Sequence, residues 1–244
     1  MSRQHPAGEW AVIAEQCTGR GARGVVNAAA PIAALAGAEA LGAGGNAYDA
    51  AVAAALAETV LLPPKCGLGG DLVALALPAG ADAPEALLAI GGAPAGLAAI
   101  ARAGSLIETG PNSVGPPAAA AGYAALATRA TFDLARLAAP ARRLAVDGFP
   151  WAAINTRLTA ASLDLLRQWN PAGSRYVPGG NPIGTGELIR LPGLAVALDE
   201  LVARGDAFLD GPVGAAIAAT VVAAGGVLSQ GDLATARAEW VACA

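Results

Sequence analysis

The chain has 244 residues, of which 55% are hydrophobic and only 14% are charged, and its formal net charge is −4. This length allows one large domain or one subunit of a larger assembly. The acidic balance and the lack of a basic stripe argue against nucleic-acid binding. Because interface cores are depleted of charge, the composition fits a surface covered by a partner, although a simple bias towards Ala and Gly explains it equally well.

Cysteine and histidine usage limits the chemistry that the chain can perform. The three cysteines Cys17, Cys66 and Cys243 are far apart, and His5 is the single histidine. A structural zinc site is therefore not expected, no cofactor is implied, and the cysteines do not suggest disulfides, which fits a reducing compartment.

No targeting or membrane segment is expected. Residues 1–16 lack the apolar stretch of a secretory signal. The uncharged segment 211–231 is broken by Gly225 and Gly226, which favours a buried helix followed by a turn over a membrane span. We therefore expect a cytoplasmic protein.

The first third of the chain is predicted to contain one strand and two helices. Residues 10–15 form a short apolar strand pattern, and a helix over 31–41 begins at Pro31. A second helix covers 47–60, with Asn46 as its N-cap. Pro63 and Pro64 end it.

A hairpin and a helical second half are predicted to follow. Strands over 72–77 and 86–90 are joined by the turn-like residues 78–84. Helices are expected over 118–129, 134–144, 154–169, 194–204, 212–224 and 232–240, with a Gly- and Pro-rich loop over 170–186. Residues 239–241 also have the character of the start of a strand. So few strands predict either an all-α protein with one hairpin or part of a larger layered α/β fold.

Seven motifs follow one another along almost the whole chain. They are GGNAYDAAVA from Gly44, CGLGGD from Cys66, GGAP from Gly91, VGPPAAAAG from Val114, LAAPARRLAVDGF from Leu137, GELIRLPGLAVAL from Gly186 and GGVLSQGDLA from Gly225. In this order they resemble the large subunit of the γ-glutamyltranspeptidase family.

The resemblance implies a fold and a partner. Family members are N-terminal-nucleophile hydrolases with a four-layer αββα sandwich of the α/β (α+β) class. A precursor cuts itself, and the new N-terminal Thr of the second chain is the nucleophile, with its own amine as the base. Residues 1–244 would then be a single domain, mostly helical with a few strands, that a small subunit from the same precursor completes. A dimer of such heterodimers is a further arrangement. No catalytic residue is expected in this chain.

Two departures from the family pattern concern substrate and processing. An arginine that grips the substrate α-carboxylate usually stands four residues before the Pro of the Ala-Pro pair, and here Ile90 occupies that position before Pro94. Ile cannot make a bidentate pair with a carboxylate, and Arg102 lies downstream on a predicted helix. Family members also continue further before the cleavage site, so Ala244 marks either the processing end or a truncation, and we favour processing.

The resemblance and the glycine pattern together predict where substrate binds. Ile90, Gly91 and Gly92 are expected to line the site, because their counterparts do so in the family. Gly69 and Gly70 are expected to permit a tight turn and a close backbone approach at its border. Asp71 would either bind a substrate amine or cap the turn.

Two other residues are interpreted as structural. Asp49, in the first turn of its helix, fits a capping and dipole role better than a functional one. Cys66 has no visible base beside it and is expected to be a small, buried side chain and not a nucleophile.

The leading functional hypothesis is an acyl-bond-cleaving enzyme of γ-glutamyltranspeptidase type with altered specificity. The bond would be an amide or an activated carbon–carbon bond of a small amino-acid-like metabolite, as in actinobacterial alkyl-proline antibiotic biosynthesis. The alternatives are an ordinary γ-glutamyl hydrolase or transferase and a non-catalytic homologue.

Overall fold

The computed structural model of the chain describes residues 19–104 and 106–243. The predicted strand over 10–15 lies outside them. In chain order the elements are α2 (Pro31–Gly42), α3 (Ala47–Leu61), β1 (Leu72–Ala76), β2 (Glu85–Ala89), α4 (Leu97–Arg102), η1 (Pro111–Ser113), α5 (Ala119–Ala127), α6 (Leu134–Asp147), β3 (Phe149–Pro150), α7 (Ala153–Ala161), α8 (Leu163–Trp169), η2 (Pro178–Gly180), β4 (Leu188–Ile189), α9 (Pro192–Arg204), η3 (Gly205–Asp210), α10 (Pro212–Ala223), α11 (Gln230–Leu233) and β5 (Glu239–Ala242).

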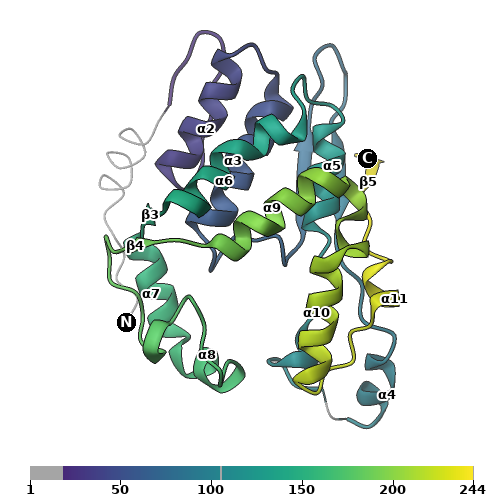
Figure 1. Cartoon of the computed structure of the whole chain (residues 1–244). Helices are drawn as coiled ribbons and strands as arrows, with labels where there is room; N and C mark the ends of the chain where they lie inside the picture. The colour runs from purple at the N-terminus through teal and green to yellow at the C-terminus, as the bar shows by residue number, and fades with distance from the viewer. Residues whose placement is uncertain (1–18, 105, 244) are drawn as a thin grey trace, which may run out of the picture.

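The helices α2, α3 and α6 pack side by side, and α9 packs on α6 and runs towards α10 (Figure 1). Pro31 begins α2 as predicted, because the first helical position needs no backbone N–H. The helices α2 and α3 come close together at Gly37, where an added Cβ would lie 2.8 Å from the carbonyl oxygen of Ala50. Small residues therefore serve close packing of backbones in this layer.

Helix α3 begins with a reciprocal cap, which confirms the prediction for Asn46. The Asn46 side chain accepts hydrogen bonds from the backbone N–H groups of Tyr48 and Asp49, at 2.8 and 3.1 Å. The Asp49 carboxylate in turn accepts the N–H of Asn46 at 2.7 Å. This capping box satisfies donors that a helix start leaves without partners.

The same Asp49 side chain also fixes a distant turn. It is fully buried and accepts the backbone N–H groups of Thr131 and Phe132 at 2.9 and 2.8 Å. Burial raises the pKa of Asp49, but the hydrogen bonds from Thr131, Phe132 and Asn46 outweigh it, so the pKa lies below its ordinary value. The structural interpretation of Asp49 is thereby confirmed.

Three antiparallel strands form a sheet in the order β1-β2-β5. The predicted hairpin is confirmed, with Leu72 opposite Ala89 and Ala76 opposite Glu85. Strand β5 joins β2 from the far end of the described chain, with Trp240 opposite Leu87.

The two faces of this sheet have different surroundings. Helix α5 lies against one face, where an added Cβ on Gly122 would be 2.9 Å from the Cβ of Leu72. The opposite face is apolar, yet Val73, Leu75 and Leu77 are 64, 71 and 65% exposed. One face of the sheet is thus covered by α5, whereas the apolar side chains on the other face are left exposed by the described residues.

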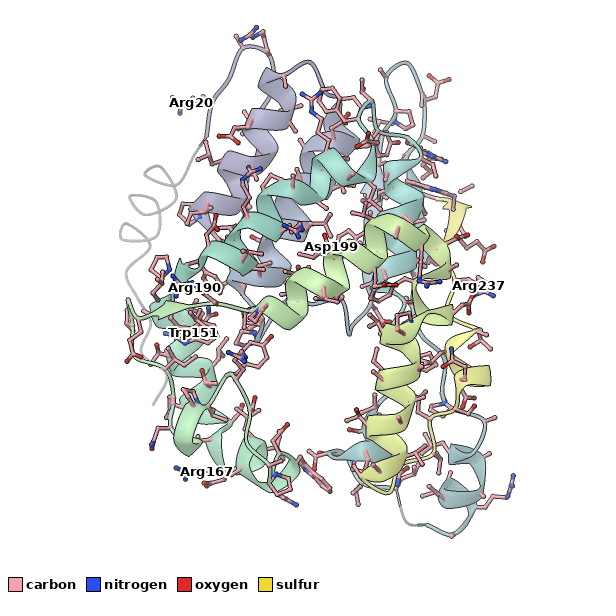
Figure 2. All side chains as sticks on the ribbon, viewed as in Figure 1. Arg20, Trp151, Arg167, Arg190, Asp199 and Arg237 are labelled. Carbon is pink, nitrogen blue, oxygen red and sulfur yellow. The ribbon has the colours of Figure 1, made fainter. Side chains whose placement is uncertain are left out.

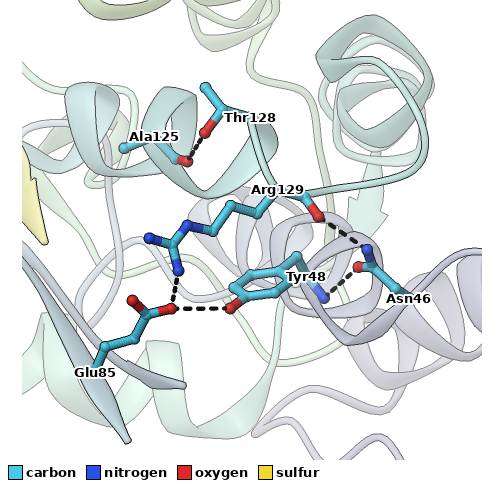
Figure 3. A network of polar contacts seen from close by, with 6 residues as sticks. All are labelled: Asn46, Tyr48, Glu85, Ala125, Thr128 and Arg129. Atoms are coloured by element: carbon cyan, nitrogen blue, oxygen red, sulfur yellow. Dashed lines mark hydrogen bonds and ion pairs between the residues drawn. The ribbon is translucent and has the colours of Figure 1, made fainter. Parts of the chain in front are cut away.

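A polar and aromatic cluster holds β5 to the sheet, and Figure 3 shows its members Tyr48, Glu85 and Arg129. Arg129, just past α5, makes an ion pair with Glu85 of β2, which also accepts a hydrogen bond from the Tyr48 hydroxyl at 3.5 Å. The Arg129 guanidinium lies 3.6 Å from the ring centre of Trp240, and Tyr48 meets the same ring edge-on. Cation–π and ion-pair contacts therefore connect three elements that are distant in sequence.

A small two-stranded ribbon, β3 paired with β4, leads into α7. Its core is Trp151, whose backbone N–H donates to the carbonyl of Glu187 at 2.8 Å. Trp151, labelled in Figure 2, is 1% exposed. Its ring stacks on that of Tyr176, with 6.3 Å between the ring centres. The sequence did not indicate this ribbon, since two-residue strands carry no periodic signal.

The helix predicted over 154–169 is two helices, α7 and α8, which meet at Ser162. The N–H of Ser162 is shared between the carbonyls of Leu158 and Thr159, at 3.2 and 3.3 Å, as is common at helix ends. Hydroxyl side chains compete for backbone partners, and Thr159 donates to the carbonyl of Asn155.

The prediction of a helix over 232–240 was also wrong. Ser229 and Asp232 form a capping box at the start of α11, which begins at Gln230 and already ends at Leu233. The following residues become β5 because β2 offers them a pairing edge. The strand character predicted for 239–241 is confirmed.

The helix expected within 211–231 is present as α10, but it is not buried as predicted: Gly214 and Val221 are its buried residues. Among the described residues, no single helix has the length and apolar character to cross a membrane. By length and composition only, the bent pair Pro192–Asp210 and Pro212–Ala223 meets that test.

Replacing Asp49 with Ala should lower the free energy of unfolding by about 3 kcal/mol, because it removes a cap and leaves buried N–H groups unpaired. The measurement is urea unfolding at pH 7. Asp133→Ala is the matched control, since Asp133 caps α6 through a single bond to the N–H of Arg136, and it should cost about 1 kcal/mol. Equal losses for the two variants would contradict the role given to Asp49.

Candidate functional site

The predicted substrate-binding residues meet at one end of the β1–β2 hairpin. Asp71 stands immediately before β1, and Ile90 immediately after β2, one step beyond the pair Leu72 and Ala89. The backbone N–H of Gly91 donates to Oδ1 of Asp71 at 2.8 Å. This bond joins the CGLGGD motif to the GGAP motif.

A third segment closes the back of this corner. An added Cβ on Gly91 would overlap the carbonyl oxygen of Pro116, and one on Gly115 would lie 3.1 Å from the carbonyl oxygen of Gly92. The N–H of Ala119 donates to the carbonyl of Gly70 at 2.9 Å. The VGPP motif therefore packs directly against both other motifs.

Gly69 and Gly70 behave differently from the prediction. The turn is present, since the N–H of Gly70 donates to the carbonyl of Gly67 at 3.3 Å. Neither glycine has a positive φ, and an added Cβ on Gly69 would meet nothing within 4 Å. The backbone of Ala119 does approach Gly70, but the contact that leaves no room for a Cβ lies at Gly91, and Gly69 faces open space.

The exposed wall of the corner is apolar. Ile90 is 55% exposed, and Leu88 and Val73 beside it are 37 and 64% exposed. Asp71 is also exposed, and it makes no ion pair with any of the described residues. Arg102 lies on α4 as predicted, beyond the loop that follows Pro94.

The far end of the Gly91–Ala95 loop is held by a residue whose role sequence reasoning missed. Asp232 accepts the backbone N–H of Ala95 at 2.8 Å and that of Ser229 at 2.8 Å. The hydrogen bond from Ala95, followed by those from Ser229, holds the pKa of Asp232 below its ordinary value. The Ser-x-x-Asp spacing of Ser229 and Asp232 is a capping signal that could have indicated the cap, but no local pattern shows that the same carboxylate reaches the loop.

The thiol of Cys66 lies beside the carboxylate of Glu58, which disfavours the thiolate. Burial first, then the charge and hydrogen bond of Glu58, raise the pKa of the Cys66 thiol. Its Sγ is 3.7 Å from Glu58 Oε2, and Glu58 Oε1 accepts the backbone N–H groups of Ala29 and Ala30 at 2.6 and 3.1 Å. A thiol held protonated is a poor nucleophile, in agreement with the prediction that Cys66 is not one, but the side chain is half-buried and not buried as predicted.

The described residues do not supply a complete catalytic set. His5, the single histidine, and the predicted processing end Ala244 lie outside them. Within residues 19–104 and 106–243, no group of three or more His, Cys, Asp or Glu side chains could hold a metal ion. The corner residues Asp71, Ile90, Gly91 and Gly92 thus carry no hydroxyl, thiol or amine side chain that could act as a nucleophile.

Comparison with known proteins identifies the family. The family model described as Gamma-glutamyltranspeptidase matches residues 33–243. The chain belongs to the gamma-glutamyltranspeptidase family. The match covers the large-subunit portion of the family, and the fold is the N-terminal-nucleophile hydrolase fold of the α/β class.

Individual relatives of this gamma-glutamyltranspeptidase-family chain differ in the activity that their names state. It is 35% identical to an acylase ACY 1 proenzyme from Pseudomonas sp. (strain SE83) over 239 residues, which cover 90% of this chain and 42% of the relative. It is 34% identical to an oxamate amidohydrolase proenzyme from Klebsiella pneumoniae over 205 residues, covering 80% and 39%. The chain therefore spans about two fifths of these relatives.

A solved structure shows the same fold. The Helicobacter pylori gamma-glutamyltranspeptidase superposes with a TM-score of 0.84 at 25% identity, covering 92% of this chain and 67% of that one. The expected relation to the gamma-glutamyltranspeptidases is confirmed.

Gly91→Ala should lower the melting temperature by about 5 °C, because the added methyl must displace the carbonyl of Pro116. Gly92→Ala is the control, since a Cβ there meets nothing within 4 Å, and its melting temperature should stay within about 1 °C of the parent. Differential scanning calorimetry of the two variants measures this. Equal melting temperatures would show that the Gly91–Pro116 contact does not constrain the site.

Proposed function

We propose that this chain is the large-subunit part of an acyl-bond-cleaving enzyme whose nucleophile lies on a partner chain from the same precursor. The observation that carries the proposal is the family match over residues 33–243. The relatives named acylase and oxamate amidohydrolase are both proenzymes, which supports a precursor that is cut into two chains.

The uncovered sheet face supports the same conclusion from within the chain. Val73, Leu75 and Leu77 lie on one side of β1 and the segment after it, with Leu88 and Ile90 beside them on β2 and just beyond. An exposed apolar sheet face of this kind marks an interaction surface. The second sheet of an αββα sandwich, supplied by the partner chain, would cover it.

The chemistry follows from an N-terminal hydroxyl or thiol with its own free amine. The amine removes the proton of the hydroxyl as it attacks the acyl carbon, and fixed N–H donors stabilise the resulting oxyanion. The corner formed by Asp71, Ile90 and Gly91 would hold the acyl group during attack. The protonated amine then gives its proton to the leaving group as the scissile acyl bond breaks, which leaves an acyl–enzyme. Attack of water on the acyl–enzyme gives hydrolysis, attack of an amine gives transfer, and both free the nucleophile.

The proposed specificity differs from that of a γ-glutamyl enzyme. The exposed wall presents Ile90 at the position where the resemblance implies an arginine, and the charged side chain beside it is the carboxylate of Asp71, so neither of them can grip a substrate carboxylate. The preferred bond would be an amide of a small acyl donor. Cleavage of an activated carbon–carbon bond, as in alkyl-proline antibiotic biosynthesis, is the finer alternative within this proposal.

Expression of the complete gene should yield two chains, the second beginning with Thr, Ser or Cys. Intact-mass measurement and N-terminal sequencing of the product test this directly. Replacing that first residue with Ala should leave one uncut chain and abolish cleavage of acyl p-nitroanilides. A second chain that starts with any other residue would rule out this catalytic mechanism, and turnover of γ-glutamyl p-nitroanilide ahead of simpler acyl anilides would favour the ordinary γ-glutamyl enzyme.

Leu75→Lys should prevent assembly of the two-chain enzyme, because it places a charge in the middle of the face that the partner covers. Size-exclusion chromatography of the processed protein gives the measurement. Arg142→Lys, an exposed change on α6 that keeps the charge beside Asp199, is the control and should assemble normally. Normal assembly of the Leu75 variant would mean that this face is not the interface.

A further inference from the structure

We propose that Asp71 sets the charge preference of the acyl-donor site, so that it favours a donor with a positively charged group near the scissile bond over one with a carboxylate there. This inference rests on the proposed function and names its substrate class. Beyond the absence of an arginine that would bind a substrate carboxylate, the Asp71 carboxylate would attract a positively charged group of the donor.

The carboxylate of Asp71 has one oxygen committed and one available. Oδ1 accepts the N–H of Gly91 at 2.8 Å, which fixes the side chain against the loop. No hydrogen bond or ion pair from the described residues reaches Oδ2. A carboxylate that is oriented by one bond and open on its other oxygen can accept a donor from a ligand at little cost in side-chain entropy.

Among the described residues, no cation forms an ion pair with Asp71. The nearest cation along the chain, Lys65, lines a different cavity with Pro63, Leu158 and Tyr176. Asp232, the carboxylate at the far end of the loop, already accepts the N–H groups of Ala95 and Ser229. The local field at this corner therefore attracts cations and repels anions.

The apolar wall strengthens this preference. Ile90 adjoins Asp71 across the end of the hairpin, and Leu88 and Val73 continue the same face. When a partner sheet covers this face, water is removed and the interaction between a bound ammonium group and Asp71 becomes stronger. A substrate carboxylate would lose its hydration there without gaining a cationic partner.

Three acyl p-nitroanilides separate the charges that a γ-glutamyl group combines. The 4-aminobutyryl anilide keeps the ammonium, the glutaryl anilide keeps a carboxylate, and the butyryl anilide has neither. For the complete, processed protein we expect kcat/KM to fall in the order 4-aminobutyryl, butyryl, glutaryl, with at least a tenfold difference between the first and the last.

The variant Asp71→Asn isolates the charge, because an Asn side-chain oxygen can still accept the N–H of Gly91. In this variant the ratio of kcat/KM for the 4-aminobutyryl and butyryl anilides should fall to near one. Asp82→Asn removes the same charge from an exposed position in the loop at the other end of the hairpin and should leave that ratio unchanged. An unchanged ratio in Asp71→Asn, or a wild-type preference for the glutaryl anilide, would overturn the inference.

Failure of the proposed function gives a different result. If none of the three anilides is cleaved, the enzyme assignment fails, and calorimetric titration with 4-aminobutyramide and butyramide then decides the binding preference alone. Tighter binding of 4-aminobutyramide that is lost in Asp71→Asn supports the role of Asp71, and equal binding of the two amides overturns it.

Discussion

Three buried or anchored carboxylates bring distant parts of this chain together by accepting backbone N–H groups. Asp49 binds the turn at Thr131 and Phe132, Asp71 binds Gly91, and Asp232 binds Ala95. In a chain so rich in Ala and Gly, each contact buries little apolar area, so packing alone positions loops weakly. Hydrogen bonds to charged groups are stronger than neutral ones, and here they determine where the loops lie.

Two of these carboxylates define the candidate site. Asp71 holds the start of the loop from Gly91 to Ala95, and Asp232 holds its end. Pro116 packs against Gly91 from behind, so the loop has little freedom on that side. In the proposed function, a loop fixed at both ends and from behind would hold the acyl donor in a preorganised position, and the nucleophile would come from the partner chain.

The three-stranded sheet is well packed on one face and uncovered on the other. Its inner face is closed by α5 and by the cluster of Arg129, Glu85 and Trp240, which secures β5. Its outer face presents Leu75 and its neighbours to solvent. The site lies at the end of this outer face, so covering the sheet and completing the site are one event in the proposed assembly.

The sequence by itself determined the local features. Asn46 as a cap, Pro31 as a helix start and the hairpin over 72–90 were predicted correctly, because capping, proline geometry and alternation depend on neighbouring residues. The motif order also indicated the family. Only the tertiary structure decided that residues 239–242 pair with β2, that Gly91 and not Gly69 is the point of close approach, and that Asp232 reaches Ala95. The last contact joins residues 137 positions apart, and no local pattern specifies which distant backbone a carboxylate will meet.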